Sequence, residues 1–195
     1  LPAKWEPEAV RRAMNALLPR DCWMVRVRTA IPGFHARKSA LGREYRYDIG
    51  VDAASMSPFR RPYEWALGRP LDAAQLRRAA LALTGEHDFR AFAVKGEPKP
   101  HFLCRLRRAE WRERDEGRGY TFHVAADRFL HHMVRMLVGT MVDIGLGRRP
   151  VEDMTTLLAR EDNADTSPPA PPEGLYFVSA EYPAEAFADH PGDAA

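Results

Sequence analysis

Cysteine, lysine and long apolar runs are all scarce in this chain of 195 residues. Its two cysteines, Cys22 and Cys104, are far apart and form no CxxC pair, so we expect two reduced thiols in a cytoplasmic protein rather than a disulfide framework. Every apolar run is far shorter than the ~18 residues that a membrane-spanning helix needs, so we expect no membrane association. Only four of the 29 basic residues are lysines. This arginine excess fits phosphate and base recognition, but it equally fits the codon bias of a GC-rich genome.

The charge is unevenly distributed along the chain. Residues 1–150 hold 28 basic and 17 acidic residues, whereas residues 151–195 hold one basic and ten acidic residues. A basic body with an acidic C-terminal section suits a polyanionic partner such as RNA. Hydrophobic residues make up 45% of the chain, which is enough for a core and excludes global disorder. Residues 184–195 are small and acidic, and we expect them to form a flexible tail.

Hydrophobic periodicity predicts helices and alternating strands in mixed order. The predicted helices cover residues 7–18, 72–84, 129–144 and 150–158, with Pro7 at a first helical position, Asp72 as an N-cap and Gly85 as a stop. The predicted strands cover residues 24–29, 45–51, 102–106, 120–126 and 175–182, with a turn at 115–117. This pattern indicates an α+β fold with a mixed, mainly antiparallel sheet and helices packed on one face. The half-polar strands argue against a parallel, doubly wound sheet.

The segment 129–144 is apolar almost all round but carries a cationic stripe. Arg128, His131, His132 and Arg135 stand at relative positions 0, 3, 4 and 7, which share one face of a helix. A cation on a buried helix needs an anion nearby, so the stripe predicts a carboxylate or RNA phosphate as partner, unless it simply faces solvent. Adjacent histidines on a helix cannot easily share a metal ion and no third ligand is close in sequence, so we expect no metal. Asp127 is a candidate N-cap for this helix.

Tyr45, Arg46 and Tyr47 follow the string Phe34-His35-Ala36-Arg37. Aromatic side chains interleaved with arginines are common on surfaces that stack bases and hold phosphates. Two tyrosines on one strand face are also common in a core, so both interpretations stay open at this point.

Five strings, taken in order, resemble the tRNA pseudouridine synthase A family. The strings are Met14-Asn15-Ala16-Leu17-Leu18-Pro19; Phe34-His35-Ala36-Arg37 with Ser39-Ala40 and Arg43 to Tyr47; Gly85-Glu86-His87-Asp88-Phe89 with Phe92; Phe129 to Arg135 with Val138-Gly139; and Gly174-Leu175-Tyr176. The resemblance implies a pseudouridine synthase catalytic fold over residues 1–183. It also implies a homodimer that acts on tRNA without a metal or organic cofactor. The implied reaction isomerises uridine at positions 38 to 40 of the anticodon stem-loop, through a flipped base and a covalent intermediate.

The same resemblance assigns roles to single residues. Tyr45 matches the tyrosine that stacks on the target uracil and handles a proton at its C5. Arg135 matches the arginine that pairs with the catalytic aspartate, and Leu175 matches a leucine that lines the base pocket. We expect the further cations Arg37, Arg43, Arg128, His131 and His132 to bind the substrate RNA.

The catalytic aspartate itself has no match in these residues. The family carries it in an Arg-Thr-Asp-x-Gly-Val-His-Ala string, whereas the similar Arg28-Thr29-Ala30 has alanine in place of the acid. We therefore expect an N-terminally incomplete member, inactive by itself. Asp88 is expected as a turn or capping residue, and Asp143 lies two turns beyond Arg135, so neither replaces the nucleophile. One alternative is an RNA-binding chain without catalysis, and another is a nuclease that uses the His131-His132 pair.

Overall fold

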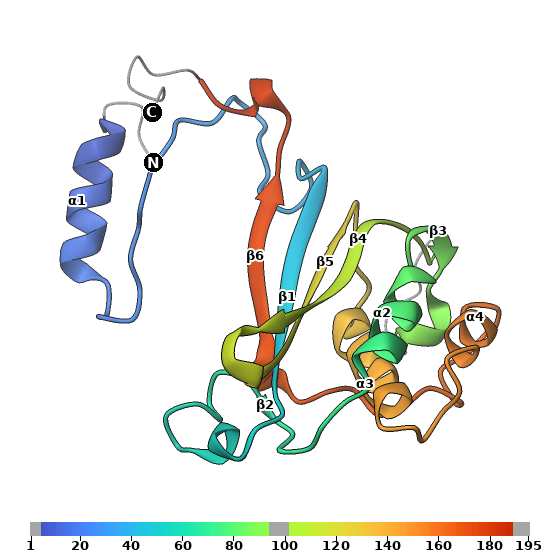
Figure 1. Ribbon diagram of the computed structural model, residues 1–195. Helices are drawn as coiled ribbons and strands as arrows, with labels where there is room; N and C mark the ends of the chain where they lie inside the picture. Colours follow the sequence, from blue (N-terminus) through green and yellow to red (C-terminus); the bar gives the residue numbers. More distant parts are fainter. Residues whose placement is uncertain (1–4, 94–101, 189–195) are drawn as a thin grey trace. The chain divides into compact units, whose positions relative to one another are not determined.

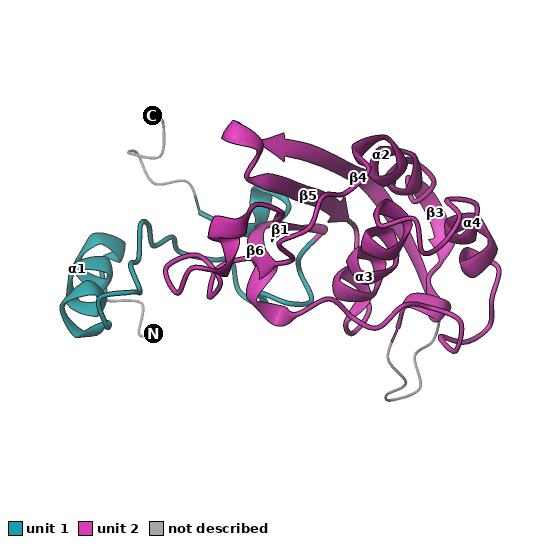
Figure 2. Cartoon of the chain, turned by 60° about the horizontal axis from the view of Figure 1, so that its bottom comes forward, with its two compact units in different colours: residues 1–40, 182–195 teal, residues 41–181 magenta. Residues whose placement is uncertain are grey.

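The computed structural model describes residues 5–93 and 102–188. The chain divides into two compact units, one made of residues 1–40 and 182–195 and the other of residues 41–181 (Figure 2). Each unit has its own organisation, described in turn below.

The larger unit is built on a six-stranded sheet (Figure 1). Its strands are β1 (Gly42–Gly50), β2 (Trp65–Ala66), β3 (Gly85–Asp88), β4 (Leu103–Arg114), β5 (Gly119–Ala126) and β6 (Leu175–Glu181). The order is β2-β1-β5-β4-β3, and β6 also pairs with β1. The pairing of β1 with β2 is parallel and the others are antiparallel. The predicted α+β class, with its mixed and mainly antiparallel sheet, is confirmed.

Helices cover one face of this sheet. They are α2 (Ala73–Leu81), α3 (Met133–Gly145) and α4 (Asp153–Leu158). The helix α2 packs against α3 and β4, and Figure 2 shows both helices over the strands β4 and β5. Trp111 of β4 donates its indole N–H to the Sδ of Met141 in α3 at 3.2 Å, so the sheet and helix interlock in a buried contact.

Burial alternates along β5 from Phe122 to Ala126, because successive side chains of a strand point to opposite faces, whereas β1 is buried throughout from Tyr47 to Gly50. Tyr47 and Ile49 of β1, with Phe122 and Val124 of β5, are fully buried toward the helices. The opposite face is charged: Arg108 of β4 bonds both Glu44 of β1, at 2.8 Å, and its neighbour Glu110. One face therefore builds the core and the other is held by ion pairs.

Asp72 caps α2 as expected, since its carboxylate accepts hydrogen bonds from the amides of Ala74 at 2.8 Å and Gln75 at 3.0 Å. The helix nevertheless ends at Leu81, and Gly85 opens β3 instead of stopping the helix. The expected helix from Pro150 starts later, at Asp153.

Two further predicted elements are wrong. Residues 24–29 form no strand. Among the described residues, the nearest β-bridge is the isolated pair Ala30 and Phe187. The predicted helix at 129–144 begins only at Met133. The backbone turns at His132, which has a left-handed φ of 62°, and a helix cannot pass through such a residue.

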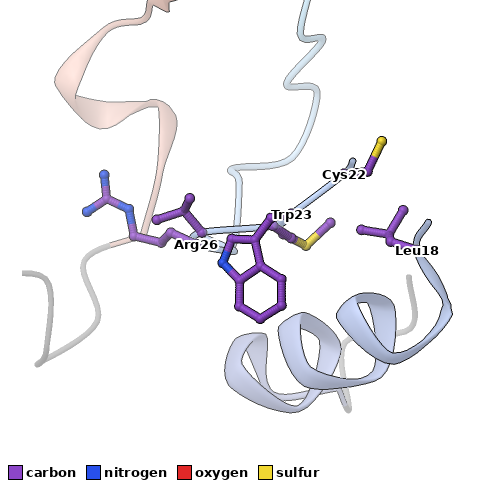
Figure 3. Close-up of a pocket in the computed structure, with 6 residues that line it drawn as sticks. Leu18, Cys22, Trp23 and Arg26 are labelled. Carbon is purple, nitrogen blue, oxygen red and sulfur yellow. The ribbon is translucent and has the colours of Figure 1, made fainter. Parts of the chain in front are cut away.

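The smaller unit contains the helix α1 (Pro7–Leu17), which begins at Pro7 as predicted. The side-chain amide of Asn15 donates to the carbonyl of Met24 at 2.9 Å and accepts from its N–H at 2.8 Å. This pair of bonds ties the helix to the chain that follows it. An open hollow of about 750 Å³ lies there, lined in part by Leu18, Cys22 and Trp23 (Figure 3). In the described parts of the chain, no helix has the length and apolar character needed to cross a membrane.

Candidate active site

Arg135 is the one residue of the predicted cationic stripe that lies within α3. Its half-buried side chain donates from Nε to the carbonyl of Ala170 at 2.6 Å, and the Ala170 N–H returns a bond to the Arg135 carbonyl at 2.9 Å. The first bond holds the guanidinium, and the second holds the backbone of α3, against residues 168–174, which we call the proline strap. The two terminal nitrogens of Arg135 have no ion-pair partner among residues 5–93 and 102–188. The side chain is thus oriented but not neutralised.

The proline strap approaches α3 and β1 closely because glycine stands at both contact points. A Cβ on Gly139 of α3 would lie 2.1 Å from the carbonyl oxygen of Pro168. A Cβ on Gly174 would lie 2.6 Å from the carbonyl oxygen of Asp48 and 2.7 Å from the ring of Tyr47. Both distances are far inside van der Waals contact, so only glycine allows this packing. The strap is therefore held at both ends.

Tyr47 provides the other fixed point of the strap. Its hydroxyl donates to the carbonyl of Pro171 at 2.6 Å, and the residue is fully buried. Burial raises the pKa of the Tyr47 hydroxyl strongly, the negative charge of Glu173 adds to this, and the positive charge of Arg135 opposes it. Tyr47 is therefore a neutral core residue, and its pKa depends on the nearby charge of Arg135.

Tyr45 lies two residues before Tyr47 and so shares its face of β1. Its ring meets Phe129 edge-on at 5.1 Å and Phe177 edge-on at 5.5 Å between centroids. The Tyr45 side chain is half-buried, and its hydroxyl forms no hydrogen bond with the described residues. Tyr45 therefore offers a partly open ring and an unused hydroxyl.

The β-sheet register separates Tyr45 from Leu175. Leu175 of β6 stands opposite Tyr47, whereas Phe177 stands opposite Tyr45, next to an irregularity between Glu44 and Tyr45 in this pairing. Phe177 is 58% exposed. Sequence reasoning missed this contact, although the two-residue period of a strand starting at Leu175 was a usable signal.

The other residues of the expected stripe lie in the turn before α3, not on a helix face, so the predicted stripe is wrong. The rings of His131 and His132 are 4.1 Å apart. Desolvation lowers the pKa of His132, and the charges of His131 and Arg135 lower it further. The turn thus brings His132 electrostatically close to Arg135.

Asp127 holds this turn in place and does not cap α3, which corrects the expected N-cap. Its carboxylate accepts from the amides of Arg105 at 2.9 Å and Arg128 at 2.7 Å. Its carbonyl accepts from the guanidinium of Arg43 at 3.0 Å. Asp127 therefore joins β4, β1 and the turn that carries Arg128.

Arg37 belongs to the smaller unit. It is exposed on a turn in which the Ser39 N–H donates to the His35 carbonyl at 2.8 Å and the Arg37 N–H donates to the His35 ring at 3.2 Å. Tyr182 donates its hydroxyl to the Ala36 carbonyl at 2.8 Å. The turn is thus well defined within its own unit.

The two other candidate acids of the larger unit are already occupied. Asp88 is the last residue of β3 and not a turn residue as expected. It accepts from the Arg90 N–H at 2.9 Å and pairs with the Arg90 guanidinium at 2.8 Å. Asp143 pairs with Arg148 at 2.9 Å. Among the described residues there is also no group of three or more potential metal ligands.

A family model described as tRNA pseudouridine synthase matches residues 79–183. The chain belongs to this family. Relatives named tRNA pseudouridine synthase A include one from Bacteroides fragilis, 35% identical over 92% of this chain and 70% of the relative. One from Thermus thermophilus is 40% identical over 91% of this chain and 70% of the relative. One from Moorella thermoacetica is 39% identical over 87% of this chain and 68% of the relative. The family resemblance of the five strings is confirmed.

Proposed function

We propose that this protein isomerises uridine to pseudouridine in tRNA, at positions 38 to 40 of the anticodon stem-loop. The observation that carries the proposal is an oriented Arg135 that has no ion-pair partner among the described residues and lies close enough to Tyr47 to affect its pKa. Tyr45 lies two residues before Tyr47, on the same face of β1. The family membership and the relatives named tRNA pseudouridine synthase A support the substrate and the reaction.

The reaction moves the bond between base and ribose from nitrogen to carbon. The target uridine leaves the base stack to reach the site, and a carboxylate attacks the nucleotide to form a covalent intermediate. The bond between ribose C1′ and uracil N1 breaks, the uracil turns, a bond from C1′ to C5 forms, and the bond between the carboxylate and the nucleotide breaks, which frees the carboxylate for the next turnover. The C5 proton is released and N1 gains a proton, so that the net change is an isomerisation. No metal or organic cofactor is needed.

Tyr45 is the residue that we assign to the base. Its partly open ring stacks on the uracil, and its unused hydroxyl is available to handle the proton at C5. Phe129 and Phe177 support the ring edge-on, an arrangement that favours a fixed ring orientation. Leu175 is assigned to the apolar lining of the base pocket, although it stands opposite Tyr47 and not Tyr45 in the sheet.

Arg135 is assigned to the catalytic carboxylate. A guanidinium presents its donors in a planar fork that matches a carboxylate in two parallel hydrogen bonds. The Ala170 carbonyl occupies only Nε, which leaves the terminal nitrogens for this pairing. We propose that the aspartate comes from an Arg-Thr-Asp-x-Gly-Val-His-Ala string outside these 195 residues.

The remaining cations are assigned to the RNA backbone. Arg37, Arg43, Arg128, His131 and His132 are the proposed phosphate and sugar contacts. Because phosphate contacts release counterions, tRNA affinity should fall as salt rises. We propose that the protein acts in the cytoplasm as a homodimer, with one tRNA spanning both subunits.

The activity is tested by release of tritium from tRNA labelled at uridine C5. A protein that carries the aspartate string as well as these residues should release tritium. Its Tyr45→Phe variant should bind tRNA with little loss and release none, whereas Arg135→Ala should lose activity or unfold. Normal turnover by Tyr45→Phe would show that the role given to Tyr45 is wrong.

The second candidate function is RNA binding without catalysis by these 195 residues. It is favoured by the fact that Arg135 meets no carboxylate in the described parts of the chain. The 195-residue chain should then bind tRNA and release no tritium. Release by this chain alone would refute the need for an outside aspartate, and cleavage of tRNA that disappears in His132→Ala would favour a nuclease instead.

A further inference from the structure

A second surface with RNA-binding chemistry lies on the loop between β1 and β2, away from Tyr45. This loop, residues 57–63, follows a short 3-10 helix at Ala53–Met56 and precedes β2 (Figure 1). It displays Phe59 and Tyr63, whose side chains are 86% and 64% exposed. Both rings are therefore accessible to a ligand.

Hydrogen bonds at both ends anchor the backbone of the loop. The amides of Arg60 and Arg61 both donate to the Ser57 carbonyl, at 3.0 and 2.9 Å, and the Tyr63 N–H donates to the Arg60 carbonyl at 2.8 Å. The far end is fixed by the hydroxyl of Tyr176 in β6, which donates to the Tyr63 carbonyl at 2.5 Å. The exposed rings are therefore presented in a set geometry.

A partly buried cluster of charged side chains joins the base of the loop to the sheet. The Arg60 guanidinium donates two hydrogen bonds to the Asp52 carboxylate, at 2.7 and 2.9 Å, and forms an ion pair with Glu64 at 2.8 Å. Glu64 is only 3% exposed, and Arg114 of β4 pairs with its other oxygen. These two acids offset these two arginines, so the cluster adds little net charge to the surface.

Arg61 supplies the net positive charge of the loop, because the charge of Arg60 is offset by acidic partners. It is exposed, and its side chain has no hydrogen-bond or ion-pair partner in the parts of the chain that the structure describes. Residues 53–63 contain no acidic side chain. The loop therefore shows two aromatic rings with a single uncompensated cation between them in sequence.

We propose that the 57–63 loop binds unpaired nucleobases of the RNA substrate, with Phe59 and Tyr63 stacking on bases and Arg61 contacting a phosphate. Stacking of bases on aromatic rings beside a cation is the usual means of holding single-stranded RNA. Tyr63 is tied to Tyr176, which stands opposite Arg46 in the sheet, and Arg46 points to the face of β1 opposite to that of Tyr45. The loop therefore contacts RNA outside the target nucleotide. This inference rests on the proposed function, because it takes tRNA as the ligand.

The test measures tRNA affinity of the full-length protein and its variants by fluorescence anisotropy at several salt concentrations. Phe59→Ala and Tyr63→Ala should each weaken binding about 5- to 100-fold, the range expected for loss of one stacked base. The slope of affinity against salt should stay the same in these two variants. Arg61→Ala should reduce the slope by about one unit, because one phosphate contact is lost. Phe59→Tyr should bind like the wild type.

Matched controls are available on α2, where Leu81 is 74% exposed and Arg77 is also exposed. Leu81→Ala and Arg77→Ala should leave affinity unchanged. Equal affinity of Phe59→Ala, Tyr63→Ala and the wild type would overturn the proposal, as would a dimer that dissociates in these variants without loss of affinity per protomer. Wild-type protein that binds tRNA but makes no pseudouridine would refute the proposed function and leave this surface standing, whereas failure to bind tRNA would refute both.

Discussion

Substituting Gly139 by alanine should destabilise the protein, although helix propensity alone predicts the reverse. Alanine in place of glycine within a helix contributes about 1 kcal/mol of stability. Here the new Cβ would lie 2.1 Å from the carbonyl oxygen of Pro168, more than an ångström inside contact. The strap cannot easily move away, because Arg135 and Ala170 exchange two hydrogen bonds beside that point. Overpacking costs roughly 1–3 kcal/mol or more, so we expect a net loss of about 1–2 kcal/mol.

Urea unfolding followed by circular dichroism measures this difference, with the slope compared to exclude a change in the unfolded state. The matched control is Gly145→Ala in the same helix. Its Cβ would meet the ends of flexible side chains, Leu76 Cδ2 at 3.1 Å and Leu71 Cδ2 at 3.3 Å, which can turn aside. Its stability should therefore change by less than about 0.5 kcal/mol. A Gly139→Ala protein that is more stable than the wild type would refute the packing of the strap on α3.

Three further predictions concern hydrogen bonds within the fold. Asp72→Ala should cost about 1 kcal/mol in urea unfolding, because the N-cap of α2 is lost, and Asp72→Asn should recover most of it. Tyr47→Phe should cost about 1 kcal/mol or more, because the Pro171 carbonyl loses its donor. Burial raises the pKa of Tyr47 in the folded protein, so its contribution is complete below the ordinary tyrosine pKa of about 10 and is lost at higher pH; unfolding midpoints between pH 10 and 12 should therefore fall less steeply in Tyr47→Phe. Asn15→Ala should speed hydrogen exchange of the Met24 amide, which loses its side-chain acceptor, and an unchanged exchange rate would contradict this contact.

Sequence periodicity predicted the elements whose stability comes from local pattern and from a core on one side. The alternation in β1 and β5 and the capping by Asp72 are of this kind, because a two-residue period and a carboxylate before a helix have few alternative structures. The segment 24–29 alternates equally well, yet a strand also requires a partner strand, and alternation does not contain that information.

The turn before α3 shows a second limit. The apolar pattern from Phe129 onward continues through His132 without a break, so periodicity extends the helix over both. The turn is set instead by distant contacts, above all the bonds from the Asp127 carboxylate to the Arg105 amide and from Arg43 to the Asp127 carbonyl. The family resemblance places Tyr45 and Arg135 in a common function, but the proline strap that orients Arg135 follows only from coordinates.

The proline strap also sets the phase of the last strand. Only three residues lie between Pro171, whose carbonyl is held by Tyr47, and Leu175, which stands opposite Tyr47 in the sheet. A single residue inserted between them would shift β6 by one position, and every side chain of the strand would then change faces. Phe177 would turn away from Tyr45. Natural variation in chain length is therefore expected before Ser167, in the loop after α4, and not between residues 168 and 175.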